Sequence, residues 1–385
     1  MFKNIALSML VVLMMSCGKP KEEWKASRSV VLDIGFVSKG KFRGHLYDRK
    51  SKETLLYFAD PITDKVIKFF NAHGELTDTI SLSKGILELR QIDGLSVISM
   101  DSIILINERG NQLCAIDKSG TVWHRLDLSQ FCEGTGQVYY FSTSGSGNFV
   151  LDGKSVLLHP NWVRKHSDSM GRKVARTLYE DSYYFYSHWV RAPHLIKVEN
   201  FLSSSPVAVY GLPDFYWNID HNVAPYIDGR YSTYQNKHIF VFSSFSPYLL
   251  RVDPTDLNQL EQLRIVDDAR AVAVPAPLAQ DFDSKVLNFE LQHKSIVGDF
   301  GYCSKSKKYL LIQTIDFSKN TEIEYRPFKA VIFDEGLQFE REVVIDQNKY
   351  LWHNSLIVED GVYLLKNKQD ENTGFGVKEY DFFEI

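Results

Sequence analysis

Two stretches of the chain repeat one pattern of short strands. Residues 54–82 and residues 101–128 each contain an apolar strand, a polar turn, a second strand that ends in Asn or Asp, a glycine turn and a third strand. Aligned on their second strands, the two stretches lie about 46 residues apart. A repeat of roughly 40–50 residues with about four strands is typical of a β-propeller, in which each repeat forms one blade.

The same pattern recurs along the rest of the chain, most loosely between residues 128 and 237. An extra strand precedes most units and would be the innermost strand of its blade. We therefore predict an all-β fold, a single β-propeller with six four-stranded blades, near residues 54–82, 95–128, 139–213, 237–265, 296–346 and 351–385. Seven blades is the second interpretation. Two packed β-sandwiches is the third, which the 46-residue match disfavours. An insert around 172–180 could form a short helix.

The last unit has too few strands for a complete blade, whereas residues 27–35, "SRSVVLDIG", form an orphan strand near the N-terminus. A sheet edge left open presents unpaired backbone groups to other chains. We therefore expect this N-terminal strand to pair with the last blade and close the ring.

The N-terminal segment indicates export. Residues 1–16 combine one lysine with an apolar run over 5–15 and end directly before Cys17. The run is too short to cross a bilayer core of roughly 30 Å as a helix, but it suits the core of a signal peptide. A cysteine at this place is typical of bacterial lipoproteins, because its thiol can be linked to diacylglycerol. We predict lipidation at Cys17; an ordinary secretory signal followed by a chance cysteine is the alternative.

The predicted domains are a lipoprotein signal peptide at 1–16, a flexible tether at 17–28 and the propeller at 29–385. The predicted location is the cell envelope, as an outer-membrane lipoprotein attached to the membrane through its N-terminal lipid. An acidic pair shortly after Cys17 resembles the export signal of some surface lipoproteins, but lysines are mixed in. Surface display and the periplasmic face therefore both remain open.

The segments "LMMSC", "YFADPITDKVIKFFNAHGEL" and "YRPFKAVIFDEGLQFERE" carry a resemblance to a known group. Together they resemble the uncharacterised six-bladed β-propeller lipoproteins of Gram-negative bacteria, TolB-like or NHL-like proteins that are assigned to domains of unknown function. The resemblance covers the whole mature chain. It implies the fold and an envelope location, and it implies no known activity.

Composition excludes several function classes. The net charge is −4 and no basic stripe is present, so nucleic acid is not an expected partner. The four cysteines show neither a disulfide framework nor metal-ligand spacing. The sequence contains no phosphate-binding loop and no G-x-S-x-G nucleophile motif. We expect no cofactor and no metal.

A ligand-binding face is the hypothesis for several clusters that place Trp or Tyr beside His, Arg or Asp. Indole faces stack on sugars or aromatic ligands, while neighbouring polar groups hydrogen-bond at their edges. The candidate residues are His159, Trp162, His188, Trp189, Arg191, Trp217, Asp220, His221, Tyr325, Arg326, Trp352 and His353. The alternative is that these side chains pack between blades. No catalytic residue can be assigned from the sequence.

The predicted function is a lipid-anchored, non-catalytic binding module of the cell envelope whose partner is a protein or a glycan. The alternative is an envelope hydrolase, lyase or lactonase with its site at the mouth of the propeller channel, where blade-connecting loops surround the axis.

Overall fold

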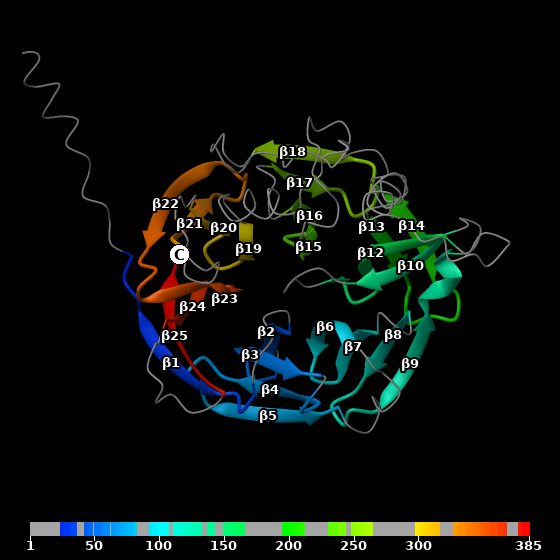
Figure 1. The fold of residues 1–385 in the computed structure, drawn as a ribbon, viewed down its shortest axis with the longest axis horizontal. Coiled ribbons are helices and arrows are strands. Elements are labelled where there is room, and N and C mark those ends of the chain that lie inside the picture. Colours follow the sequence, from blue (N-terminus) through cyan, green and yellow to red (C-terminus); the bar gives the residue numbers. More distant parts are fainter. Residues whose placement is uncertain are drawn as a thin grey trace, which may run out of the picture.

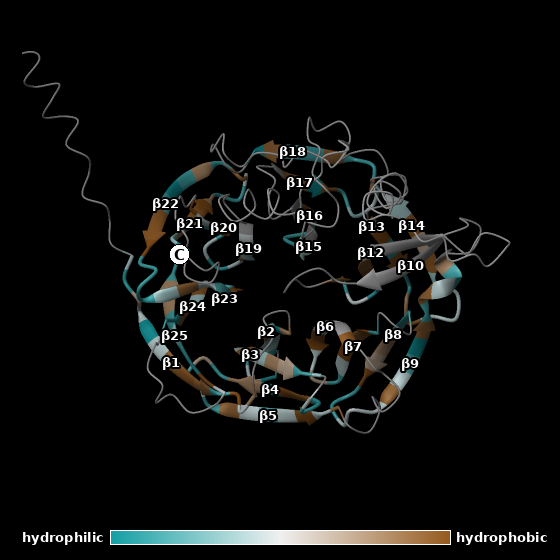
Figure 2. Cartoon of the chain, viewed as in Figure 1, coloured by the Kyte–Doolittle hydropathy of each residue, from teal (hydrophilic) through white to brown (hydrophobic). Residues whose placement is uncertain are grey.

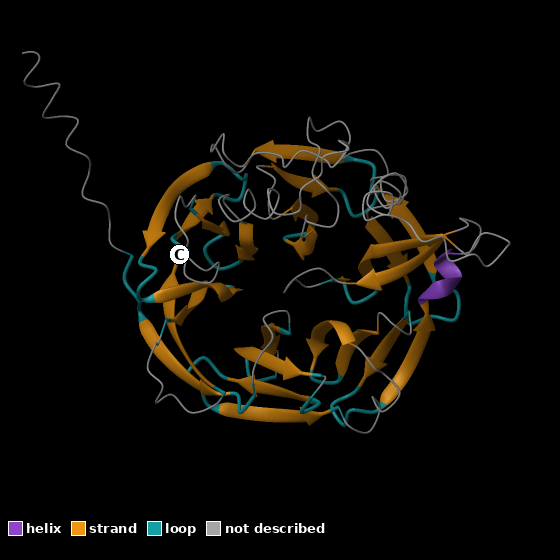
Figure 3. Cartoon of the chain, viewed as in Figure 1, coloured by secondary structure: helices purple, strands orange, loops and turns teal. Residues whose placement is uncertain are grey.

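The fold is a closed ring of six antiparallel sheets, seen in a computed structural model (Figure 1). The structure describes residues 24–36, 42–48, 50–61, 63–82, 92–107, 111–132, 137–142, 149–165, 195–211, 230–243, 248–264, 297–315, 326–367 and 376–385. Strands form all six sheets, and one short helix, η1 (Leu128–Cys132), lies at the rim (Figure 3). The six-bladed β-propeller predicted from the repeats is confirmed.

The blades are numbered in chain order, and each begins with its innermost strand. Blade 1 consists of β2 (Arg43–Asp48), β3 (Glu53–Asp60), β4 (Val66–Phe70) and β5 (Leu76–Ser81), and blade 2 of β6 (Ile92–Ser99), β7 (Ser102–Asn107), β8 (Gln112–Ile116) and β9 (Val122–Asp127). Blade 3 consists of β10 (Gln137–Ser142), β12 (Ser155–Lys165), β13 (Leu195–Glu199) and β14 (Val207–Gly211), with the short β11 (Val150–Leu151) paired to β12.

The remaining three blades follow the same order. Blade 4 consists of β15 (Arg230–Gln235), β16 (His238–Ser243), β17 (Tyr248–Val252) and β18 (Leu260–Arg264), and blade 5 of β19 (Val297–Cys303), β20 (Lys308–Thr314), β21 (Phe328–Phe333) and β22 (Phe339–Ile345). Blade 6 consists of β23 (Tyr350–Val358), β24 (Gly361–Lys366), β25 (Val377–Glu384) and the N-terminal β1 (Arg28–Asp33).

The apolar core is divided among six clusters, and each cluster combines side chains from two neighbouring blades. Hydrophobic residues lie along the strands, and hydrophilic residues are frequent in the turns between them (Figure 2). Because both faces of a blade contact a neighbour, its middle strands are buried on both faces. This explains why segments such as "SIILIN" in β7 are apolar throughout and do not alternate.

The N-terminal strand closes the ring, as predicted. β1 pairs antiparallel with β25 over its whole length, from Arg28 opposite Phe382 to Asp33 opposite Val377. The side chain of Leu32 is fully buried in the cluster that joins blade 6 to blade 1, where β3 supplies Phe58. Both chain ends therefore meet in one blade, and no strand edge is open at the seam.

Polar groups reinforce this seam. The carboxylate of Asp381 on β25 accepts hydrogen bonds from the hydroxyls of Ser29 and Tyr350 and pairs with the ammonium of Lys366 at 2.9 Å. Burial would raise the pKa of Asp381, but these hydrogen bonds outweigh it and lower the pKa below its ordinary value. The carboxylate thus stays ionised and keeps β1 tied to the blade.

The first described residues, from Trp24 onward, lie inside the segment that the sequence predicts as a tether. The indole nitrogen of Trp24 donates to the backbone carbonyl of Glu384 at 3.0 Å, and its ring packs against Phe383. The backbone nitrogen of Ser27 donates to the carbonyl of Phe382 at 2.8 Å. The predicted signal peptide and the possible helix at 172–180 lie outside the described residues.

Candidate functional site

A small cavity lies within the central channel, between the innermost strands of five blades. These strands are sheet edges, so part of the wall is formed by backbone groups that no further strand covers. Its volume is about 140 Å³, well below the roughly 300–1,000 Å³ of pockets that enclose a drug-sized ligand. The lining residues are Gly44, His45, Tyr57, Ser96, Val97, Thr233, Tyr234, Gln235, Asp299, Phe300, Gly301, Ser355, Leu356 and Ile357.

An irregularity in β23 shapes one wall of this cavity. The pairing of β23 with β24 shifts register between Leu351 and Leu356, and Asn354 within this bulge has a φ of 65°. Such a left-handed backbone is uncommon for a residue other than glycine and is often found at functional sites. The bulge places the Ser355 hydroxyl 3.4 Å from a carboxylate oxygen of Asp299 on β19.

A buried arginine stands behind this wall. Arg43 on β2 is 8% exposed, and it donates from Nε to the carbonyl of Ser355 at 3.2 Å and from Nη1 to Oδ1 of Asn354 at 3.1 Å. Blade 1 is thereby attached to the bulge of blade 6. Burial lowers the pKa of Arg43, and the charge of Asp299 acts in the opposite direction. A guanidinium remains protonated in proteins, so the pair is a buried cation beside a titratable acid.

The carboxyl of Asp299 titrates close to neutrality. Burial raises its pKa to about 6, although the charge of Arg43 and hydrogen bonds from the Phe300 backbone and Ser355 oppose the shift. Above this pH the carboxylate and the guanidinium make the wall neutral overall. The wall can then accept hydrogen bonds at Asp299 and can both donate and accept them at the Ser355 hydroxyl.

Replacing Asp299 with Asn should remove one pH dependence of stability. The folded-state pKa of about 6 lies above the ordinary value of an aspartate, so wild-type Asp299 stabilises the fold when protonated and loses that contribution as pH rises through about 6. The difference in unfolding free energy between wild type and Asp299→Asn should fall by about 2 kcal/mol between pH 4 and pH 7. Urea unfolding at several pH values measures it, and a difference that does not change with pH would contradict the assignment.

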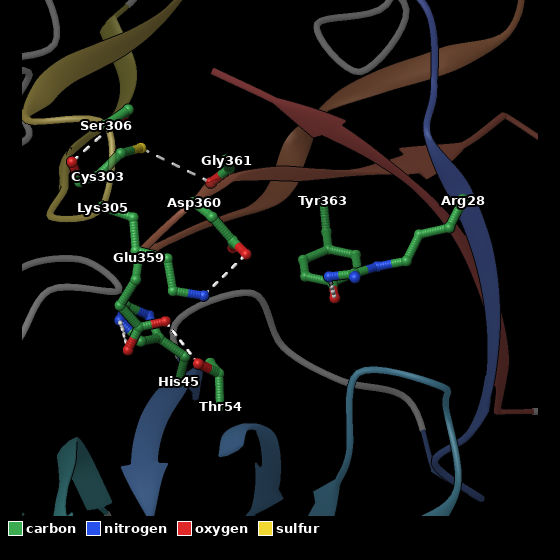
Figure 4. A network of polar contacts seen from close by, with 10 residues as sticks. All are labelled: Arg28, His45, Thr54, Cys303, Lys305, Ser306, Glu359, Asp360, Gly361 and Tyr363. Carbon is green, nitrogen blue, oxygen red and sulfur yellow. Dashed lines mark hydrogen bonds and ion pairs between the residues drawn. The ribbon is translucent and has the colours of Figure 1, made fainter. Parts of the chain in front are cut away.

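A second polar network joins three blades beside the cavity (Figure 4). Glu359, at the turn between β23 and β24, accepts a hydrogen bond from the Thr54 hydroxyl at 2.7 Å and lies 3.9 Å from Nε2 of His45. In the neighbouring blade, Lys305 forms an ion pair with Asp360 at 3.1 Å. Burial lowers the pKa of His45, against the opposing charge of Glu359, so the imidazole tends to be neutral.

The structure describes some of the ligand-binding residues predicted from the sequence. Trp352 and His353 lie on β23, and the Trp352 ring would come within 2.8 Å of a Cβ placed on Gly298 of blade 5. Arg326 is 1% exposed and lies two residues before the start of β21. These three residues are absent from the lining of the central cavity. At Trp352 the geometry matches the alternative of packing between blades, because its ring joins the cluster shared by blades 5 and 6.

The other predicted ligand residues are not placed as a site. His159 and Trp162 belong to β12, where they pair with Ser142 and Tyr140, and their side chains lie outside the described residues. Also outside the described residues are His188, Trp189, Arg191, Trp217, Asp220, His221 and Tyr325. Cys17 lies there as well.

Sequence reasoning missed Arg43, Asp299 and Ser355. A usable signal was present, because Arg43 and Asp299 are charged residues inside the innermost strands "RGHLYD" and "VGDFGYC", next to glycines. In the described part of the chain, no group of three His, Cys, Asp or Glu side chains could hold a metal ion. Nor does any helix in that part have the length and hydropathy needed to span a bilayer.

Comparison with known proteins supports the fold. No family model matches the chain, and no curated protein does. The crystal structure of a DUF4221 family member from Bacteroides vulgatus is similar over 95% of this chain and 99% of that one, with a TM-score of 0.68 and 14% identity. A candidate exported protein from Bacteroides fragilis matches over 96% and 98%, with a TM-score of 0.51 and 10% identity. At these identities the likeness shows a shared fold.

Proposed function

We propose that the protein is a lipid-anchored binding module of the cell envelope that receives the neutral, hydroxyl-rich end of a glycan in its central cavity. One observation carries the proposal: the cavity wall sets the Asp299 carboxylate against the buried Arg43, next to the Ser355 hydroxyl. A neutral wall with both donors and acceptors suits sugar hydroxyls, which themselves donate and accept hydrogen bonds. For a charged ligand, repulsion by the like-charged member of the pair would offset attraction by the other.

The cavity is too small to enclose a whole glycan, but it can bind one end of a glycan. About 140 Å³ is room for one small group or one end of a longer molecule. Hydroxyls of Ser96 and Thr233, both nearly fully buried, add polar groups from blades 2 and 4. A glycan would thus insert its terminus along the channel axis while the rest of the molecule lies outside.

Binding of three matched sugars tests the proposal. Glucose, glucuronate and glucosamine share one ring and differ in charge, so titration calorimetry with each reports the charge that the cavity accepts. We expect glucose, or a terminal neutral hexose on a glycan array, to bind best. Asp299→Asn should weaken its affinity roughly tenfold, as loss of a hydrogen bond to a charged group does. The exposed Ser304→Ala serves as control.

A preference for glucosamine or glucuronate would contradict the neutral-sugar assignment. If no sugar binds and an envelope protein co-purifies instead, the partner is a protein and the glycan proposal fails.

The anchor has its own test. Cys17→Ala should abolish lipid labelling and move the protein from the membrane fraction to the soluble fraction of the envelope. Membrane association that survives this substitution would contradict attachment through an N-terminal lipid.

A second candidate function is an envelope hydrolase, lyase or lactonase, favoured by the pKa of Asp299 at about 6. A group that exchanges its proton near neutral pH is suited to general acid–base catalysis. Incubation of the wild type with bound glycans, followed by mass spectrometry of the products, tests it. Turnover that follows a group titrating near pH 6 and disappears in Asp299→Asn would establish the enzyme, and unchanged glycans would exclude this role for them.

A further inference from the structure

The two faces of the ring differ in what they carry. In every blade the first strand turns back into the second at the same face, because successive strands are antiparallel. We call this the hairpin face; it holds the turns 50–52, 236–237, 304–307 and 359–360. The opposite face, here the loop face, holds the ends from which the chain passes from one blade to the next, for example the connection 346–349.

The N-terminal segment joins the ring at the hairpin face. Asp360 lies in the hairpin turn of blade 6, and its carbonyl accepts the backbone N–H of Ile385 at 3.2 Å. The preceding residue, Glu384, is paired with Gly361 and accepts the indole N–H of Trp24 at 3.0 Å. Asp360 is also tied to the hairpin turn of blade 5 through Lys305 (Figure 4). Trp24 is therefore fixed at the level of the hairpin turns.

The remaining chain up to the predicted anchor is short. Trp24 is the seventh residue after Cys17, so this segment reaches at most about 25 Å even when fully extended. β23 is nine residues long, which corresponds to about 30 Å from one face of the ring to the other. A tether that begins at the hairpin face thus cannot lead around the ring and let the loop face rest on the bilayer.

We infer that the hairpin face is turned toward the membrane and that the loop face is turned away from it, as the surface that an envelope glycan can reach. This inference rests on the lipid anchor in the proposed function. In this orientation the mouth of the central channel on the loop face, where β2, β19 and β23 begin, points away from the bilayer.

The charge of the hairpin face agrees with a surface that is held near the bilayer without adhering to it. Lys50, Lys52, Lys237 and Lys307 are exposed there. The outer turns of the same face carry Asp117 and Asp253, whose pKa values are lowered by hydrogen bonds from Ser119 and Thr255, respectively, so that both remain ionised. The face thus carries charges of both signs and is not a uniformly basic surface of the kind that adheres to anionic headgroups, so the tether sets the distance.

Energy transfer to the bilayer measures the orientation. The full lipidated chain, with Cys132 replaced by Ser, is labelled at Lys50→Cys on the hairpin face or at Lys349→Cys on the loop face; both native lysines are exposed, and Cys114 and Cys303 are buried. The protein is reconstituted into phosphatidylcholine vesicles that contain about one third phosphatidylglycerol and a trace of headgroup-labelled acceptor lipid.

We expect clearly stronger transfer from position 50 than from position 349. Insertion of about 20 Gly and Ser residues between residues 18 and 24 should abolish the difference, because a flexible linker of that length can pass around the ring. Equal transfer with the native tether, or stronger transfer from position 349, would overturn the orientation. If the lipidated chain does not float with the vesicles at all, the anchor itself fails, which flotation shows independently of the transfer values.

Discussion

Removal of residues 24–33 should lower the free energy of unfolding by at least about 3 kcal/mol and leave the ring open between blades 6 and 1. The deletion takes away the buried side chains of Val30 and Leu32, and burial of each such side chain contributes roughly 1.5–3 kcal/mol. It also uncovers the edge of β25, which then presents unpaired backbone groups. Urea unfolding followed by fluorescence measures the change, and the opened protein should also aggregate.

A matched deletion of residues 18–23 serves as the control, because it shortens the chain before Trp24 and leaves every described contact with the ring in place. Its unfolding midpoint should equal that of the intact chain. If the longer deletion yields no folded protein, Leu32→Ala still gives a measurable loss of about 2–5 kcal/mol. An unchanged midpoint in both the longer deletion and Leu32→Ala would contradict closure by β1.

Gly120→Ala should destabilise the ring by about 3 kcal/mol. Gly120 lies in the turn between β8 and β9 with a φ of 77°, and a Cβ there would stand 1.9 Å from the backbone carbonyl oxygen of Ser81 in the neighbouring blade. The substitution therefore combines a strained backbone with a backbone clash that no side-chain rotation can relieve. Thermal or urea unfolding provides the measurement.

Gly153→Ala separates these two contributions. Gly153 also has a positive φ, 67°, but a Cβ there would meet no atom within 4 Å. We expect a cost of about 1 kcal/mol, from backbone strain alone. Equal losses for Gly120→Ala and Gly153→Ala would show that blades 1 and 2 do not approach each other as closely as described.

Much of the fold is predictable from the sequence because short local patterns of apolar and turn residues determine the strands and the turns. Apolar segments like "SIILIN" and polar turns like "DKSGT" recur in most blades, so most of the strand order follows without any long-range information. Closure by the N-terminal strand is also predictable, since the last unit lacks a strand and "SVVLD" has no other partner. The bulge in β23 is not predictable from the sequence, because a register shift between Leu351 and Leu356 depends on how two blades pack against each other.

The candidate site is harder to predict for a physical reason. Arg43, Asp299 and Ser355 come from three blades, and only ring closure brings the first of them beside the other two. None belongs to a motif with recognisable spacing. Clusters of Trp and His in a sequence suggest a ligand-binding site. In a propeller, however, large aromatic side chains also pack between blades, as Trp352 does against blade 5.

Intact mass and peptide mapping of the protein purified from native envelope membranes test the central claim most directly. We expect a mature chain that begins at Cys17, with a diacylglyceryl group on its thiol, seven residues before Trp24, which hydrogen-bonds to Glu384 of blade 6. A mature chain that begins at another residue, or a Cys17 that carries no lipid, would contradict a membrane-anchored propeller and the orientation derived from it.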